Sequence, residues 1–240
     1  MARNIDIEGS AALVSGANRG IGRAIARALL DRGAKVYAGA RDPRSITDAE
    51  LIPVRLDVTD AASVAAAARQ CADVSIVVNN AGLSTGTSPL SGAALDAARR
   101  EIEVNYLGPL AVSRAFAPVL GANGGGALVN ILSVMSWITV PHAGTYAASK
   151  AAAWSMTNAV RLMLRDQGTL VVGVHFGYAD TDMAAAIAGP KLDPAEVARQ
   201  VVEAIAEGRE EVLADPLSRQ VRAALSGELR LLYPEAAATA

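Results

Sequence analysis

The 240-residue chain is 52% hydrophobic and has 22 basic and 24 acidic residues, for a formal net charge of −2 at pH 7. This near-neutral charge gives no electrostatic basis for binding nucleic acid or a membrane surface, and no apolar run approaches the roughly 18–20 residues that cross a bilayer. The start of the chain lacks the apolar stretch of a secretory signal, so we expect a cytoplasmic protein. Cys71 is the single cysteine, which excludes an intramolecular disulfide and a multi-thiolate metal site.

Strand-like and helix-like segments alternate along the chain. Short runs rich in Val, Ile and Leu predict strands at 11–16, 35–40, 52–58, 74–80, 127–133, 169–176 and, as a possible seventh, 211–214. Helical patterns lie between them at 20–32, 60–70, 92–120, 145–166 and 193–207. Strands that are apolar throughout are buried on both faces, so the pattern predicts an α/β fold. We expect a Rossmann-type, doubly wound parallel sheet of about seven strands, with helices on both faces.

No linker, repeat or charge block divides the chain. We therefore expect one domain over residues 1–240, with a frayed C-terminal tail at 233–240.

A glycine cluster, SGANRGIG at 15–22, follows the first predicted strand and opens the first predicted helix. Gly16 permits a sharp turn, Gly20 permits close approach of a pyrophosphate, and Gly22 permits close packing of helix on strand. The helix N-terminus adds free N–H groups and a positive dipole for phosphates. The spacing differs from the G-x-G-x-x-G dinucleotide fingerprint. Taken alone, the cluster fits either a dinucleotide site or a structural turn.

Further motifs follow the glycine cluster in order. NNAG (79–82) ends the fourth predicted strand, and Val104–Asn105 lies in the helix before the fifth strand. Ser133 ends that fifth strand, and YAASK occupies 146–150. Together these motifs resemble the short-chain dehydrogenase/reductase family, in its compact type, from about residue 10 to 183. The resemblance implies an NADP(H)-preferring carbonyl reductase or alcohol dehydrogenase that assembles as a homotetramer or homodimer.

The choice of cofactor depends on the end of the second predicted strand. NAD-dependent relatives carry aspartate where this chain has Ala40, and Arg41 follows it. An arginine at this place accommodates a 2′-phosphate. Arg19 lies on the same side of the predicted site, so two guanidinium groups favour NADP(H). Asp42 leaves open a plain surface ion pair with Arg41.

The resemblance implies a set of cofactor-binding residues from the glycine cluster, the ends of the next three strands, the catalytic helix and the segment after the sixth strand. They are Gly16, Asn18, Arg19, Gly20, Ile21, Gly22, Arg41, Asp57, Val58, Asn80, Ala81, Gly82, Tyr146, Lys150, Gly177, Thr181 and Met183. For Asp57 and Val58, a helix N-terminal turn explains the residues nearly as well as an adenine contact.

Tyr146 and Lys150 are four residues apart and share one face of a predicted helix. A tyrosine has a pKa of about 10 and needs a nearby cation to act as an acid/base at neutral pH. An ammonium about 4 Å away contributes on the order of 4 kcal/mol at an effective dielectric constant near 20. Ser133 can hydrogen-bond the substrate oxygen and stabilise a developing alkoxide.

Each of these residues is ordinary by itself, since such a tyrosine–lysine pair is usually a surface pair and such a serine usually a turn. The resemblance implies in addition that Lys150 holds the nicotinamide ribose, and that Asn105 connects Lys150 to a proton relay through a water. The expected catalytic residues are therefore Asn105, Ser133, Tyr146 and Lys150. No metal is expected.

The segment VHFGYADTDM (174–183) departs from the family pattern, because relatives have Pro-Gly where this chain has Phe176–Gly177. The resemblance implies that it lies over the nicotinamide and begins a short substrate lid around 178–195. Phe176 fits either a pocket wall or core filling behind the strand. We expect an apolar or aromatic substrate, and a pocket wall formed with His175 by Val134, Met135, Trp137, His142, Phe176 and Tyr178.

The function predicted first is the reversible, NADPH-dependent reduction of a ketone or aldehyde, with hydride from nicotinamide C4 and a proton from Tyr146. One alternative is an enzyme like 3-oxoacyl-(acyl-carrier-protein) reductase, which the few lysines make less attractive. Another is a non-catalytic NADP(H)-sensing protein, which would have no reason to keep the full catalytic set.

Overall fold

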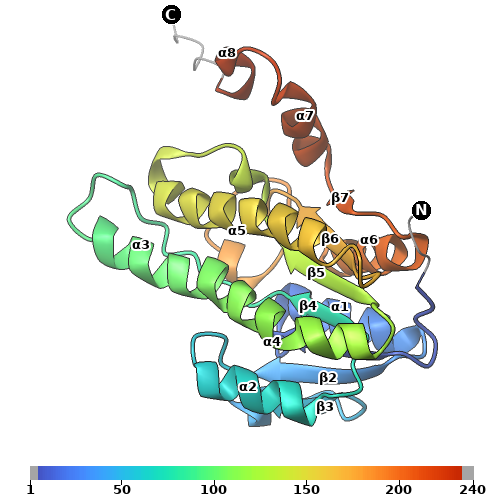
Figure 1. The fold of residues 1–240 in the computed structure, drawn as a ribbon. Coiled ribbons are helices and arrows are strands. Elements are labelled where there is room, and N and C mark those ends of the chain that lie inside the picture. The colour runs from blue at the N-terminus through green and yellow to red at the C-terminus, as the bar shows by residue number, and fades with distance from the viewer. Residues whose placement is uncertain (1–4, 234–240) are drawn as a thin grey trace, which may run out of the picture.

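Seven parallel strands form a single sheet in the order β3-β2-β1-β4-β5-β6-β7. The structure is a computed structural model that describes residues 5–233 (Figure 1). The strands are β1 (Ala11–Ser15), β2 (Lys35–Ala40), β3 (Ile52–Arg55), β4 (Ile76–Asn79), β5 (Ala127–Ile131), β6 (Leu170–His175) and β7 (Glu211–Leu213). The predicted doubly wound parallel sheet is confirmed, including its seventh strand. Except for Tyr233, the tail predicted at 233–240 lies outside the described residues.

Helices cover both faces of the sheet (Figure 1). They are α1 (Gly20–Asp31), α2 (Ala61–Gln70), α3 (Ala94–Ile102), α4 (Gly108–Ala122), α5 (Gly144–Met163), α6 (Pro194–Glu207), α7 (Pro216–Ala224) and α8 (Leu229–Leu232). Helices α1 and α6 pack on one face, and α2, α4 and α5 pack on the other. None of the helices in the described part of the chain combines the length and apolarity needed to span a membrane.

The two helical layers follow from the alternation of side chains along each strand. On β1, Ala12 is buried in the core cluster that contains Ile25 of α1, whereas Leu13 is buried in the cluster that contains Phe116 of α4. Successive strand residues point to opposite faces, so a strand that is apolar throughout needs a helical layer on each side. The apolar runs of the sequence therefore specify a three-layer arrangement.

The helix predicted over 92–120 is interrupted. Between α3 and α4 the chain forms a π-helical turn, η2 (Glu103–Leu107), in which Asn105 is buried. Such single π turns commonly occur at functional sites. Gly108, directly after this π turn, packs closely against the loop before α2. A Cβ on Gly108 would lie 2.8 Å from the Val58 side chain.

The strand order places the predicted site. Strands β1 and β4 are neighbours in the sheet, and the chain winds away from them in opposite directions. Ligands of open α/β sheets bind at such a switch point, beyond the carboxyl ends of the strands. The glycine cluster follows β1 and NNAG ends β4, so both motifs lie at this point.

Candidate active site

The turn after β1 has backbone conformations that favour glycine. The φ angle is +65° at Gly16 and +54° at Gly20, and a Cβ on Gly22 would lie 2.2 Å from the Gly16 carbonyl oxygen. Helix α1 begins at Gly20, and its N-cap residue Arg19 makes no side-chain cap bond. The first-turn N–H groups are therefore available to an anion. The sharp turn expected at Gly16 and the close packing expected at Gly22 are both present.

The end of β4 holds this turn in place. The Ser15 hydroxyl accepts hydrogen bonds from the backbone N–H of Asn80 (3.0 Å) and of Ala81 (3.1 Å). The Asn80 amide donates to the carbonyls of Ser15 (2.9 Å) and Gly16 (3.2 Å). Asn80 thus holds the backbone of the glycine turn, and its role in cofactor binding stays a prediction. Ser15 was not among the predicted site residues; its signal in the sequence is a hydroxyl at the very end of a buried strand.

The two arginines expected near a 2′-phosphate have different surroundings. Arg41 is exposed at the end of β2, and it makes no ion pair within the described part of the chain. Asp42 binds Arg44 instead (2.9 and 3.0 Å), so the alternative of an Arg41–Asp42 surface pair is wrong. Arg19 Nη1 lies 3.0 Å from Asp182 Oδ2, and this ion pair connects the glycine turn to the segment after β6.

Asp57 and Val58 form a structured turn before α2. Asp57 Oδ1 accepts hydrogen bonds from the Thr59 hydroxyl (2.7 Å) and backbone N–H (3.0 Å), and these bonds lower the pKa of Asp57. Val58 is buried in the core, and Asp60 caps α2. The helix N-terminal turn is therefore present, and an adenine contact stays a prediction.

The four expected catalytic residues come from three elements that meet at the carboxyl edge of the sheet. Lys150 and Tyr146 lie on α5, Ser133 caps the 3₁₀ turn η3 (Val134–Ser136) after β5, and Asn105 lies in η2. Lys150 is buried, its Nζ donates to the Ile131 carbonyl (2.9 Å), and it lies 5.8 Å from the centroid of the Tyr146 ring.

The electrostatics differ from the expected effect of Lys150. Burial raises the pKa of Tyr146 to about 12, although a side-chain hydrogen bond with Ser133 acts in the opposite direction. Burial also lowers the pKa of Lys150 to about 8. The expected lowering of the tyrosine pKa is not found because desolvation outweighs the Ser133 hydrogen bond, and the Lys150 ammonium is directed at the Ile131 carbonyl.

Asn105 connects the loop after β4 to the catalytic helix. Its Oδ1 accepts from the Leu83 N–H (2.8 Å), and its Nδ2 donates to the Leu83 carbonyl (2.7 Å) and to Ser149 Oγ (2.9 Å). Gly82 lies beside it, since a Cβ there would be 3.4 Å from Asn105 Oδ1 and 3.9 Å from Lys150 Nζ. The water-mediated link from Asn105 to Lys150 stays a prediction.

Three of the expected wall residues gather around Tyr146. Val134, Met135 and Trp137 belong to one apolar cluster, against which Tyr146 packs. Met135 and Trp137 also line a hollow of about 370 Å³ between η3 and α5. Tyr178 is 37% exposed. Contact of these residues with a substrate stays a prediction.

His175 has a more specific position than the sequence indicated. Its ring stacks on Trp137, with centroids 3.8 Å apart and planes at 17°. Its Nδ1 lies 3.0 Å from the Ser133 carbonyl oxygen. Because a carbonyl only accepts, Nδ1 carries the hydrogen. Burial lowers the pKa of His175 to about 4, so the ring is neutral at physiological pH. His175 therefore fixes both ends of the turn that carries Ser133.

Two of the expected wall residues lie elsewhere. Phe176 is 7% exposed and belongs to the core cluster that contains Val174 and the residues of α1 and α6. Neighbouring residues at the end of β6 point to opposite faces, so His175 faces the site and Phe176 packs behind the sheet. The prediction that Phe176 walls the pocket is wrong. His142 is exposed on η4 (Pro141–Ala143) and lies outside the apolar cluster.

The segment predicted as a lid, 178–195, is closed at its base. Residues Ala179 and Leu192 form a bridge, with backbone bonds of 2.8 Å from Asp180 N to the Leu192 carbonyl and from Leu192 N to the Tyr178 carbonyl. Between them lies the 3₁₀ turn η5 (Asp182–Ala184), which contains the exposed Met183.

The predicted lid segment also lies against the glycine turn. The Thr181 methyl group lies 3.1 Å from where a Gly20 Cβ would be, and Gly177 N donates to Asp215 Oδ2 (2.6 Å). Contact of Thr181 with the nicotinamide stays a prediction. Closure of the lid on a substrate stays a prediction.

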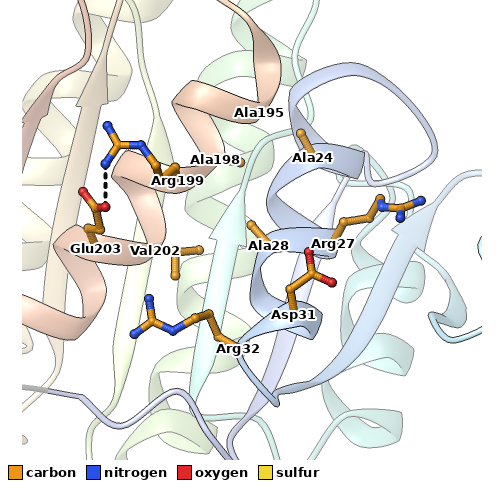
Figure 2. Close-up of a pocket in the computed structure, with 10 residues that line it drawn as sticks. All are labelled: Ala24, Arg27, Ala28, Asp31, Arg32, Ala195, Ala198, Arg199, Val202 and Glu203. Carbon is orange, nitrogen blue, oxygen red and sulfur yellow. Dashed lines mark hydrogen bonds and ion pairs between the residues drawn. The ribbon is translucent and has the colours of Figure 1, made fainter.

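A groove of about 440 Å³ lies outside this site, between α1 and α6 (Figure 2). Its floor is formed by alanines and Val202, and its rim is charged. Its lining is Ala24, Arg27, Ala28, Asp31, Arg32, Ala195, Ala198, Arg199, Val202 and Glu203. No residue predicted for catalysis, cofactor or substrate is among them, so the groove is separate from the candidate active site.

Comparison with known proteins agrees with this geometry. Residues 10–191 match the short chain dehydrogenase family. A cis-4-hydroxycyclohexanecarboxylate dehydrogenase of Sinomonas cyclohexanicum is 35% identical over 188 residues, which are 73% of this chain and 76% of that protein. A short chain dehydrogenase from Burkholderia cenocepacia J2315, solved in complex with NADP, is 37% identical with a TM-score of 0.91, covering 95% of this chain and 98% of that one. A Burkholderia phymatum relative solved with NAD is 28% identical with a TM-score of 0.81, covering 91% and 93%.

Proposed function

The chain belongs to the short-chain dehydrogenase family, and from this premise we propose that it catalyses the reversible, NADPH-dependent reduction of a ketone or aldehyde to an alcohol. Its class, an oxidoreductase acting on CH–OH groups with a nicotinamide cofactor, follows from the family. The observation that carries the proposal is that Ser133, Tyr146 and Lys150 lie at the carboxyl edge of the sheet, at which the glycine turn also lies.

The glycine turn fits a dinucleotide. Any side chain on Gly22 would collide with the turn itself, and the first turn of α1 keeps its N–H groups uncapped. Gly16, Gly20 and these N–H groups would hold the pyrophosphate, and Lys150 the nicotinamide ribose. When bound, the nicotinamide supplies or accepts the hydride at the substrate carbon.

The chain's own residues handle the proton and the developing charge. In reduction, the Tyr146 hydroxyl donates its proton to the substrate oxygen, while Ser133 donates a hydrogen bond to the same oxygen as negative charge develops there. Lys150, with its pKa lowered to about 8, keeps a substantial protonated fraction near neutral pH and stabilises the phenolate that remains. Alcohol oxidation reverses these steps.

NADPH is favoured over NADH by the end of β2. Ala40 stands where an acid would bind a ribose 2′-hydroxyl, and Arg41 is exposed without an ion-pair partner in the described chain. A free guanidinium suits a 2′-phosphate. The NADP complex of the Burkholderia cenocepacia relative supports the same choice, although the Burkholderia phymatum relative was solved with NAD.

The apolar cluster around Tyr146 supports an apolar or aromatic carbonyl substrate. Val134, Met135 and Trp137 present methyl, thioether and indole surface next to Tyr146, and the Arg222 guanidinium lies 5.9 Å from the centroid of the Trp137 ring. The relative from Sinomonas cyclohexanicum is named for a hydroxylated six-membered ring acid. Cyclic ketones are therefore the first compounds to assay.

Replacement of the tyrosine tests the proposed function. In NADPH oxidation with a panel of cyclic and aromatic ketones, Tyr146→Phe should lower kcat by at least about 100-fold, the lower end of a general acid's contribution, while NADPH binding by fluorescence stays unchanged. Tyr37→Phe removes the same hydroxyl from β2, where it binds Asp73 (2.9 Å), and should keep normal turnover. Near-normal turnover by Tyr146→Phe would contradict the mechanism. Tight NADPH binding without turnover of any carbonyl by the wild type would favour the sensing protein.

A further inference from the structure

Glu101 is a fully buried carboxylate that the proposed mechanism does not use. It lies on the inner face of α3 with Ala94 and Ala97, while its neighbours Arg99 and Arg100 are exposed. The helical spacing of that face calls for an apolar residue at this position. A buried carboxylate is costly unless hydrogen bonds compensate it. An acid at this position is therefore expected to make specific hydrogen bonds or to serve a function.

Glu101 binds the loop that follows β4. Its Oε1 accepts from the backbone N–H and the hydroxyl of Thr85, both at 2.7 Å. The Thr85 and Thr87 hydroxyls are 2.8 Å apart, and Thr145, next to the catalytic tyrosine, donates to the Thr87 carbonyl (3.3 Å). Glu101 Oε2 is buried and has no partner within the described residues. One carboxyl oxygen of Glu101 thus holds the loop.

The same loop is held by a second side chain one helical turn further on. Asn105 binds Leu83 through both its amide oxygen and its amide nitrogen. Glu101 on α3 and Asn105 in η2 therefore hold residues 83–87 on the side of the site where Tyr146 lies. Asn105, an expected catalytic residue, shares with Glu101 the task of supporting this loop.

We propose that Glu101 is a positioning residue of this active site. It holds the Thr85 turn in place and, through Thr87 and Thr145, supports the start of the helix that carries Tyr146. The inference rests on the proposed function, because it takes Tyr146 as the acid/base.

Two variants test the hold on the Thr85 turn. Glu101→Gln keeps an acceptor oxygen for Thr85, so the ketone KM should stay nearly unchanged. Glu101→Asp shortens the reach, so the ketone KM should rise several-fold while the KM for NADPH stays normal.

Thr85→Val supplies an independent measurement, since it removes the hydroxyl bond to Glu101. It should also raise the ketone KM; an unchanged ketone KM in Glu101→Asp and Thr85→Val would overturn the support of the Thr85 turn. That failure differs from failure of the proposed function, in which the wild type shows no turnover that depends on Tyr146.

Discussion

The glycine turn after β1 and the segment after β6 meet at one edge of the sheet but are built by different means. The turn is built from backbone, with Gly16 and Gly20 in conformations that favour glycine. A Cβ on Gly22 would lie 2.2 Å from the Gly16 carbonyl oxygen, which is too close for any side chain. The segment after β6 depends on side chains, chiefly His175, which stacks on Trp137 and binds the Ser133 carbonyl. We therefore expect substitutions in the turn to displace its backbone, and substitutions in the segment after β6 to change side-chain contacts only.

The largest effect is expected from Gly22→Ala. Its Cβ would meet the Gly16 carbonyl and the Asn80 amide at 2.2 and 2.3 Å, so the turn must move and its N–H groups lose their alignment. We expect the KM for NADPH to rise by roughly 100-fold, as for several lost hydrogen bonds. Gly92→Ala is the matched control, because a Cβ there meets nothing within 4 Å. Equal NADPH kinetics for both variants would remove the contrast between the two regions.

A smaller effect, confined to one cofactor, is expected from Arg41→Ala. Loss of a charge-assisted contact to the 2′-phosphate should raise the KM for NADPH by roughly 10-fold or more and leave the KM for NADH nearly unchanged. Arg44→Ala serves as the control, since Arg44 is already bound to Asp42. Steady-state kinetics with both cofactors checks this. Equal changes with NADPH and NADH would contradict the assignment of Arg41.

Two substitutions of His175 test the side-chain-built region. His175→Phe keeps a ring against Trp137 but leaves the Ser133 carbonyl without its donor, at a cost of about 1–3 kcal/mol. We expect kcat to fall by roughly tenfold while the KM for NADPH stays normal. His175→Asn places an amide N–H near the position of Nδ1 and should recover part of kcat while raising the ketone KM. If both variants kept the wild-type kcat, the position of Ser133 and the η3 turn would not depend on His175.

The same residue predicts an acid sensitivity of the fold. The pKa of His175 is about 4 in the folded protein, against an ordinary value near 6.5. Between these values the unfolded chain binds a proton that the folded protein does not, so stability is complete above about pH 6.5 and falls as the pH drops toward 4. His175→Phe should flatten this part of the curve of unfolding free energy against pH. An unchanged slope in urea titrations would contradict the buried neutral ring.

The smallest effect is expected at the ion pair that joins the two regions. Arg19 and Asp182 are both largely exposed, and such pairs contribute about 0–1 kcal/mol. Asp182→Asn releases Arg19 toward the 2′-phosphate, so the KM for NADPH should fall by up to about threefold, with a weaker effect at high salt. Measuring this KM at two salt concentrations checks it. A tenfold rise would show that the pair, and with it the lid, supports the cofactor site.

Most of the fold, and the elements that carry the catalytic candidates, could be predicted because their signals are local. Continuous apolar runs specify buried strands, and the four-residue spacing of Tyr146 and Lys150 places both on one helix face. Other features depended on distant neighbours. The π-helical turn at Asn105 has no periodicity of its own, and the partner of Asp42 is Arg44 because of a turn that the charges alone do not reveal.

The order of strands and helices, the glycine turn and the family membership follow from the amino-acid sequence, because each depends on residues adjacent along the chain. Tertiary packing decided which ring faces the site, since His175 and Phe176 are neighbours whose directions depend on the sheet's two faces. It also decided that the buried acid Glu101 on α3 binds the Thr85 turn. Burial and long-range contact set these properties, and neither is encoded by local spacing.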